Sequence, residues 1–346
     1  MSRQLGIHGL HALLLAGCLP EYERIQGEHL LYEYPQGFHV CAGTVPYIDG
    51  LVPFLAQRLA FTAPEHMRFT WSPDGGSVVV GNHVQSAEPT NVHELTHGVT
   101  GGMPARFFAE GVAVAMDSRQ DTLAPRYPDS QEDLKKPIWD PRATMTASDS
   151  EDVNYVTAAA FVEFLLVRHG PEAFHEFYRG LGGPPTMAWI ADRFRRAYGT
   201  ELEDEVELFL AGIPACDANA YSLPEPECSG PRLAWTSDRL LEHPLSFSCD
   251  APGVVGGIEP GGYAWPSFYP ATVVVEERGL YTVGVNSADV SLRFGPCFGC
   301  PWDRKDVLVS PGEFQRTLEL DPGVYYLRLG STSDEAHELV VSLQRY

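Results

Sequence analysis

Two histidines separated by three residues lie in the first third of the chain, and a glutamate directly follows the first of them. His93, Glu94 and His97 belong to the pattern His-Glu-Leu-Thr-His. Residues four apart on a helix project from the same face, so both imidazoles can direct a ring nitrogen at one ion. Zinc accepts such ligands and leaves a position for water. Glu94, on the adjacent edge of the helix, is the predicted base that takes a proton from the zinc-bound water.

A third ligand is available a short distance further on. Glu110 lies thirteen residues after His97, within the mostly apolar segment 104–113. A buried carboxylate in such a segment is costly unless it is paired or bound to a metal. The sequence therefore predicts a Zn2+ site with ligands His93, His97 and Glu110. The competing interpretation is a surface helix that carries two solvated histidines.

The elements that must position these residues have clear signals. Thr90 and Asn91 are favourable N-cap residues, and Glu94 follows Asn91 by three positions, as in a capping box. The first helix is expected to end near 98–102, and Pro104 suits the first turn of the next. Upstream, the pattern predicts a helix over 47–60 and strands over 29–33, 37–42, 67–71 and 77–80. Downstream, it predicts helices over 153–169, 171–181, 185–198 and 200–211.

These motifs resemble those of the gluzincin metallopeptidases, in particular the peptidase MA-like bacterial proteins. In that group a glutamate in an Ala-Glu-Gly context is the third zinc ligand, and Ala109, Glu110 and Gly111 match it. The similarity spans about residues 25–211 and includes 154–155, 161–162, 168–172 and 194–199. It implies a peptidase domain that combines a small mixed sheet with a helical bundle.

The resemblance leaves two supporting roles open. Gluzincins commonly supply a tyrosine or histidine that stabilises the developing oxyanion, and Tyr155, with His175 behind it, is the candidate by position. The alternatives are a packed tyrosine and a surface histidine. Thermolysin-type members have an acidic residue four positions after the glutamate, where this chain has Val114, so the group that orients the histidines is unassigned. His83 has no partner at ligand spacing and is interpreted as structural.

The excess of acidic over basic residues limits the kinds of partner that the protein can bind. With 24 basic and 46 acidic residues, the formal net charge is −22. Such a surface repels phosphate backbones, so we expect no nucleic-acid partner.

Acidic clusters at 129–133 and 149–152 lie within the long connection 117–151. Calcium binding is one interpretation of these clusters, and a solvated loop beside the cleft is the favoured one, because the EF-hand pattern is incomplete.

The N-terminus has the features of an export signal. Arg3 is followed by an apolar stretch and then by Leu-Ala-Gly-Cys at 15–18, which resembles a bacterial lipoprotein signal with cleavage before Cys18 and acylation of its thiol. The alternative is a frayed terminus with a chance cysteine. We therefore expect a lipid-anchored protein of the bacterial cell envelope, on the outer membrane at its periplasmic face or at the cell surface. The membrane is reached only through acylated Cys18.

Six cysteines remain after Cys18, and this even number agrees with export and disulfide formation. The pairing cannot be deduced, because six cysteines allow fifteen connectivities. Cys297 and Cys300 also have the spacing of half a zinc knuckle, but no second such pair completes one. The six are Cys41, Cys216, Cys228, Cys249, Cys297 and Cys300.

Beyond about residue 214 the helical periodicity gives way to short apolar strands separated by glycines and prolines. Strands are expected over 271–276, 280–285, 290–294, 314–318, 324–329 and 339–343, at the spacing of a β-sandwich. The late strands resemble the β-sandwich appendages that follow secreted bacterial peptidases. Trp265, Phe268 and Tyr269 are candidate sugar platforms, although packing in the core or at an edge is the favoured interpretation.

The sequence thus predicts an α+β protein with a signal peptide (1–17), a metallopeptidase-like domain (18–213) and a disulfide-containing β-sandwich (214–346). The expected activity is zinc-dependent hydrolysis of an extracytoplasmic protein or peptide, with Glu94 and Tyr155 as catalytic residues. One alternative is a catalytically silent lipoprotein that uses its fold to bind a partner. In another alternative the β-domain carries the main function, as a module that binds a carbohydrate or a surface.

Overall fold

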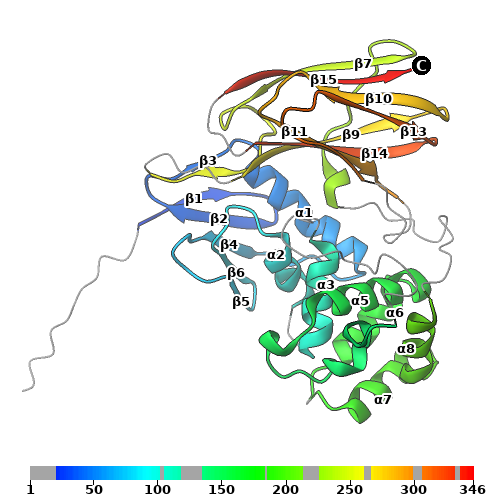
Figure 1. The fold of residues 1–346 in the computed structure, drawn as a ribbon. Coiled ribbons are helices and arrows are strands. Elements are labelled where there is room, and N and C mark those ends of the chain that lie inside the picture. The colour runs from blue at the N-terminus through cyan, green and yellow to red at the C-terminus, as the bar shows by residue number, and fades with distance from the viewer. Residues whose placement is uncertain are drawn as a thin grey trace, which may run out of the picture.

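The computed structural model describes residues 21–101, 105–117, 135–183, 185–212, 226–260, 266–298, 306–331 and 336–346. These residues form two stacked parts (Figure 1): a β-sandwich above, and a mixed sheet with a group of helices below. The protein is therefore of the α+β class, as the sequence predicts. The predicted boundary at 213/214 and the predicted signal peptide both lie outside the described residues.

The lower sheet has five strands in the order β1-β2-β4-β6-β5. Its three central strands run parallel, whereas β1 and β5 pair antiparallel at the two edges. A parallel pair needs a crossover, and helix α1 (Thr44–Arg58) provides it between β2 and β4. The strands are β1 (Tyr22–Gln26), β2 (Leu30–Pro35), β4 (Met67–Trp71), β5 (Val78–Val80) and β6 (His83–Ser86). Of the predicted strand 37–42, only β3 (His39–Val40) forms.

The helices follow the predicted order with small changes at their ends. They are α2 (Val92–Thr100), α3 (Arg106–Met116), α5 (Tyr155–His169), α6 (Pro171–Gly180), α7 (Met187–Tyr198) and α8 (Leu202–Ala211). Helices α3 and α5 pack closely at Gly111, which has no side chain. A Cβ at this position would lie only 2.7 Å from the Ala158 carbonyl oxygen. Together with the sheet and α1, they enclose the first hydrophobic core.

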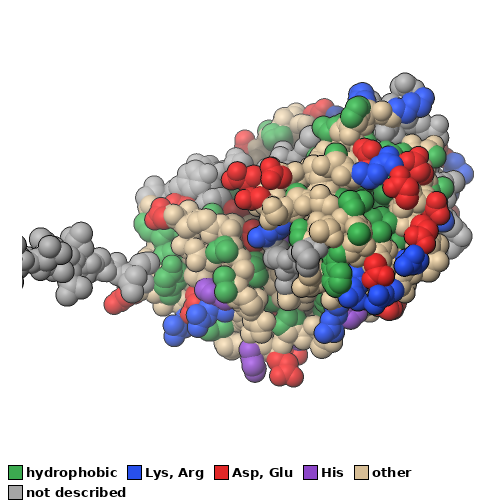
Figure 2. Space-filling view, turned by 90° about the horizontal axis from the view of Figure 1, so that it is seen from below, with side chains coloured by type: hydrophobic (Ala, Val, Ile, Leu, Met, Phe, Trp, Pro, Cys, Tyr) green, Lys and Arg blue, Asp and Glu red, His purple; other side chains and the backbone are tan. Residues whose placement is uncertain are grey.

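The segment between α3 and α5 has more structure than the predicted loop. Its described part forms three 3-10 turns, η1 (Pro137–Trp139), η2 (Pro141–Ala143) and η3 (Ser150–Asp152). Arg142 joins it to α8 through ion pairs with Glu203 and Glu207. Figure 2 shows acidic and basic side chains beside one another on the face seen from below. The acidic cluster at 129–133 lies outside the described residues, whereas Asp149 caps η3.

The upper part is a sandwich of two four-stranded antiparallel sheets, ordered β13-β10-β15-β7 and β12-β11-β14-β9. All six strands predicted from the sequence are present, and the second core lies between the two sheets. The strands are β7 (Leu240–Phe247), β9 (Ser267–Val275), β10 (Gly279–Val285), β11 (Ser291–Pro296), β12 (Val307–Val309), β13 (Gln315–Leu320), β14 (Gly323–Ser331) and β15 (His337–Arg345).

The two parts are joined where α1 begins. Strand β3 pairs with β8 (Gly257–Ile258), and a disulfide links Cys41 to Cys249. The Thr44 hydroxyl donates to the Gly256 carbonyl oxygen (2.7 Å) and accepts from the Gly256 N–H (2.8 Å). Segment 39–44 is therefore bonded to the sandwich, although it precedes the helix of the lower part.

A second disulfide, Cys228–Cys297, ties η4 (Pro226–Ser229) to the end of β11. Cys297 is thus a disulfide partner and not half of a zinc knuckle. Cys18, Cys216 and Cys300 lie outside the described residues. None of the helices in the described ranges combines the length and apolar composition needed to cross a membrane.

Candidate metal centre

Helix α2 carries the two histidines on one face. It begins where Asn91 Oδ1 accepts a hydrogen bond from the Glu94 N–H (3.0 Å), as the capping signal predicts. It ends at Gly101, whose positive φ of 70° lets its N–H reach the His97 carbonyl oxygen. Between these caps His93 and His97 are one turn apart, with their ring planes at 84°. His97 is buried, and His93 is partly exposed.

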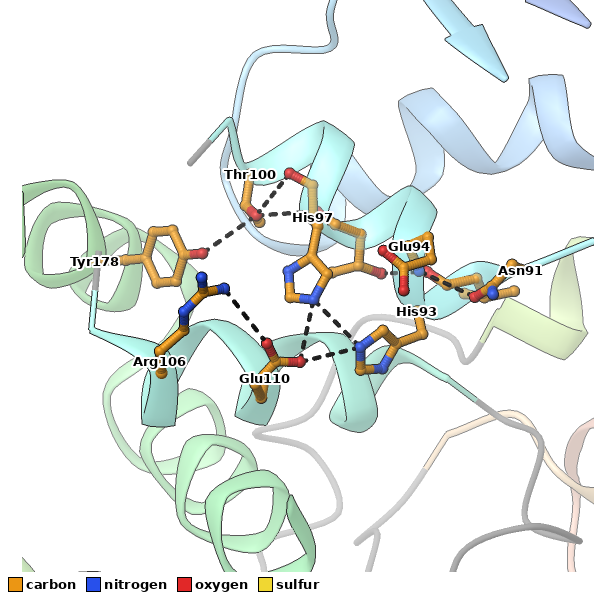
Figure 3. Close-up of polar contacts among 10 residues, drawn as sticks. Asn91, His93, Glu94, His97, Thr100, Arg106, Glu110 and Tyr178 are labelled. Carbon is orange, nitrogen blue, oxygen red and sulfur yellow. Dashed lines mark hydrogen bonds and ion pairs between the residues drawn. The ribbon is translucent and has the colours of Figure 1, made fainter. Parts of the chain in front are cut away.

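Helix α3 crosses below α2 and brings Glu110 up to both rings (Figure 3). Glu110 Oε2 lies 3.1 Å from His93 Nε2 and 3.3 Å from His97 Nε2. The two Nε2 atoms are 3.2 Å apart. Three atoms from two helices thus form a nearly equilateral triangle, and these are the three residues predicted from the sequence.

The spacing of this triangle fits a metal ion. Ligand atoms about 2.0–2.1 Å from a tetrahedral ion are about 3.3 Å apart. Hydrogen bonding alone cannot satisfy all three contacts. If both Nε2 atoms carry protons, two donors oppose each other, and if one does not, its lone pair faces the carboxylate. His97 Nδ1 is also buried without a hydrogen-bond partner. Two imidazoles and a carboxylate therefore converge as a cradle for a divalent cation.

The electrostatics of the cluster keep the carboxylate ionised. Burial alone would raise the pKa of Glu110, but hydrogen bonds and charge interactions with His93 and His97 outweigh it and hold this pKa at about 2. Burial opposes protonation of His93, yet the bond to Glu110 raises the pKa of this imidazole overall. Arg106 Nη1 lies 3.9 Å from the other oxygen, Glu110 Oε1. Arg106 thus faces Oε1, while Oε2 faces the rings.

Glu94 lies beside the triangle without belonging to it. Its side chain projects from α2 near the two histidines (Figure 3). Burial raises the pKa of its carboxyl, while the two histidines lower it. A carboxylate with a raised pKa is a better proton acceptor near neutral pH than a fully solvated one.

Tyr155 lies beside His93. It is the first residue of α5, and its ring centroid is 6.3 Å from that of His93. Burial and the charge of Glu110 raise the pKa of its phenol, so the hydroxyl keeps its proton and remains a donor. Asn154 fixes the start of α5 by capping the Thr157 N–H and by donating to the Ile138 carbonyl oxygen.

The two other histidines singled out in the sequence lie elsewhere. The ring of His175 packs against Phe61, with centroids 4.3 Å apart, and His175 is not among the converging ligands. His83 Nε2 contacts Thr70 Oγ1 at 2.9 Å within the lower sheet. This contact agrees with a structural role for His83.

Sequence reasoning missed Asp117, a buried carboxylate near the site. Asp117 ends α3 seven residues after Glu110, on the same helix face, and its charge contributes to the raised pKa of His93. The position four residues after Glu110, where thermolysin-type members have an acidic residue, is occupied by the buried Val114. The seven-residue spacing of Asp117 from Glu110, two helical turns, is the sequence signal that could have identified it.

A second missed contact lies behind His97. The buried Tyr178 hydroxyl is 3.3 Å from Thr100 Oγ1, and Thr100 in turn donates to the Thr96 carbonyl oxygen (2.9 Å). These bonds link α6 to the last turn of α2. They fix the last turn of the helix that carries both histidines. No residue spacing in the sequence predicts these bonds.

The chain matches solved structures at low sequence identity. No protein-family model matches the chain, and no curated protein matches it. A two-domain M1 zinc metallopeptidase bound to L-arginine matches with 16% identity over 60% of this chain and 54% of that chain, at a TM-score of 0.38. The pre-peptidase C-terminal domain of a collagenase from Bacillus anthracis matches with 10% identity over 33% and 94%, at 0.23. A periplasmic inhibitor of g-type lysozyme from Escherichia coli matches with 12% identity over 34% and 97%, also at 0.23.

Proposed function

We propose that this protein is a gluzincin-type zinc peptidase that hydrolyses protein or peptide substrates outside the cytoplasm. One observation carries the proposal: His93, His97 and Glu110 converge at 3.1–3.3 Å from two separate helices. Two imidazoles and one carboxylate are a zinc donor set that leaves a coordination position open. A bound zinc ion would act there as a Lewis acid toward a carbonyl group and toward water.

Glu94 supplies the proton transfer in this proposal. Its carboxylate lies next to the ligands and has a raised pKa because it is partly buried. It takes the proton of the attacking water and delivers it to the amine that leaves. General acid–base groups of this kind contribute roughly 10²–10⁴-fold in rate.

Tyr155 supplies a hydrogen-bond donor to the oxygen of the scissile carbonyl as negative charge develops on it. The raised pKa of its phenol keeps that donor protonated. It comes from α5, whereas the two histidines and Glu94 come from α2, and its ring lies 6.3 Å from that of His93. A donor and a base from separate elements suit the attack of water on a carbonyl group.

A peptide has a place to bind beside the site. Strand β5 is the edge of the lower sheet and packs against α2. Its side chains Val78 and Val80 are exposed, and an extended peptide can add to such an edge through main-chain hydrogen bonds. This edge favours a polypeptide substrate over a small ester or amide.

Two disulfides among the described residues fit folding in an oxidising compartment. We further propose that Cys18 is the acylated N-terminal residue of a mature lipoprotein in the bacterial envelope. Labelling with a radioactive or clickable fatty acid tests this assignment. Cells that express Cys18→Ser should show no labelled protein, and equal labelling of the variant would contradict it.

The function is tested by metal analysis and by one substitution. The purified protein should contain about one zinc per chain and should cleave members of a peptide library. Glu94→Gln keeps the shape and the metal ligands, so it should retain zinc while losing roughly 10²–10⁴-fold in kcat. Glu176→Gln, an exposed glutamate on α6, is the matched control and should behave as the wild type.

The outcomes separate the competing functions. A chain without bound metal contradicts the proposal. Zinc binding without cleavage of any peptide would instead favour the catalytically silent lipoprotein. Full activity in Glu94→Gln would show that Glu94 is not the base.

A further inference from the structure

A pocket opens on the sandwich, outside the proposed metal centre. It has a volume of about 300 Å³ and lies on the sheet β12-β11-β14-β9. The inner face of this sheet carries the second core, so the pocket belongs to the outer face. Small-molecule sites in proteins begin at about this size. The side chains that matter for recognition are Phe268, Asp289, Ser291, Arg293 and Arg328.

Gly330, which has no side chain, forms part of the floor of the pocket. Gly330, the next-to-last residue of β14, pairs with Ser291 on one side and with Phe268 on the other. Its backbone does not have a positive φ, so the glycine is not needed for conformation. A Cβ at this position would lie 3.1 Å from Ser291 Oγ. Glycine inside a strand costs about 0.5–1 kcal/mol relative to alanine, and it commonly marks a place where a ligand approaches the backbone.

Two arginines flank this floor. Arg293 on β11 pairs directly with Arg328 on β14, and both project from the same face as Gly330. Within the described part of the chain, the Arg328 guanidinium makes no ion pair or hydrogen bond and lies 3.8 Å above the Phe268 ring. Its planar fork is thus held in place while its N–H donors remain available.

The other side chains that line the pocket determine which kind of ligand Arg328 would bind. Asp289, from the turn before β11, lines the same pocket as the two guanidinium groups. An anion of high charge, such as phosphate, would meet this carboxylate unfavourably. A ligand with one carboxylate and several hydroxyls matches both, because hydroxyls donate to Asp289 and the carboxylate accepts from arginine. Phe268 is itself buried between Tyr47 and Arg328, so it is a support for Arg328 and not a sugar platform.

We infer that this pocket binds an acidic sugar of the hexuronate type. The carboxylate of the sugar lies against Arg328 and Arg293, and its ring hydroxyls meet Asp289 and Ser291. The pocket, with its volume of about 300 Å³, admits the ring.

The test is calorimetric titration of the purified full chain with galacturonate, galactose and sulfate. Galacturonate should bind measurably, and galactose, which lacks the carboxylate, should bind at least about tenfold more weakly. Sulfate should also bind more weakly, because it has no hydroxyls for Asp289. Equal binding of galactose, equal binding of sulfate, or no binding of galacturonate would each overturn the inference.

Variants locate the binding at the pocket. Arg328→Gln should weaken galacturonate binding about tenfold or more, and Gly330→Val should abolish it by filling the floor. Arg316→Gln, on the other sheet at β13, is the matched control and should bind as the wild type. Arg328→Lys retains the charge and the long stem but not the planar fork, so it should bind with intermediate affinity. Unchanged binding in Gly330→Val, with unchanged thermal unfolding, would place the sugar elsewhere. Because binding is measured without hydrolysis, loss of peptidase activity would not affect these results.

Discussion

The two hydrophobic cores of this chain differ in the side chains that they bury. Among the described residues, every buried charged or imidazole side chain belongs to the lower part, whereas the buried polar residues of the sandwich are hydroxyls. Those of the lower part are Glu33, Arg58, His97, Glu110, Asp117, Glu163 and Glu205, and those of the sandwich are Thr272, Thr282 and Ser331. Burying a charge is costly unless it is paired or bound to a metal. The lower core therefore bears a cost that the sandwich core does not.

The partners of these carboxylates show where that cost serves chemistry. Glu33 pairs with Arg24 and Arg68, which suits a structural ion pair. Glu110 instead faces two imidazole nitrogens that also face each other. Only the second arrangement needs a cation to be satisfied. Burial of a charge alone does not identify a site, whereas convergence of lone pairs does.

The largest expected effect comes from breaking that convergence. Glu110→Gln keeps the size of the side chain but removes its charge, so the metal content should fall toward zero after dialysis and hydrolysis should fall to background. Metal analysis and peptide cleavage measure both. Glu33→Gln, the matched buried glutamate, should retain metal, and equal metal loss in the two variants would contradict the distinction.

A change in the sandwich core should affect stability without affecting the metal. Leu292→Ala removes a fully buried side chain between the two sheets and should lower the unfolding free energy by about 2–5 kcal/mol. Denaturant unfolding measures the loss. Metal content at low temperature should stay at the wild-type value, and its disappearance would mean that the two cores are not separate in function.

Removal of the proposed oxyanion donor should have a smaller effect than loss of the metal ligand. Tyr155→Phe removes one hydroxyl beside His93 and should lower kcat roughly 10²–10³-fold with zinc retained. Tyr34→Phe, which removes a hydroxyl bonded to Glu23 on the sheet, is the control. Unchanged kcat in Tyr155→Phe would reduce this tyrosine to a packing role.

The smallest effect is expected at Asp117. Asp117→Asn removes the negative charge that acts on His93 and should weaken zinc binding about 10–100-fold, as substitution of groups behind metal ligands commonly does. Competition with a chromogenic chelator measures the affinity. An unchanged affinity would leave the orientation of His93 to other contacts.

Local signals in the sequence were sufficient for the elements that carry the site. The Asn91 cap, the glycine after Thr100 and the apolar periodicity of α3 and α5 are short-range features, and the helices formed at these positions. Strand β4 was predicted to the residue. These elements follow local propensity because each forms its own hydrogen bonds or a continuous apolar run.

The missed strands depend on distant partners or on edge positions. Strand β7 contains Pro244, which argues against a central strand, and it lies at the edge of its sheet, where proline is tolerated. Strand β1 is also an edge, and most of its side chains are exposed, so the alternation of burial is weak. The predicted strand 37–42 shortened to β3 because its partner β8 lies more than 200 residues away and pairs with only two residues.

The sequence by itself determined the identity of the converging residues, because four-residue spacing places His93 and His97 on one helix face and an apolar context makes Glu110 an unusual buried acid. Only the tertiary structure decided that α3 crosses α2 at the height where the three ligand atoms lie 3.1–3.3 Å apart. It alone revealed Asp117 near His93 and paired Arg293 with Arg328 across two strands. The physical reason is range. Helix spacing and capping act over a few residues, whereas helix crossing and strand register are set by packing between segments that are far apart in the chain.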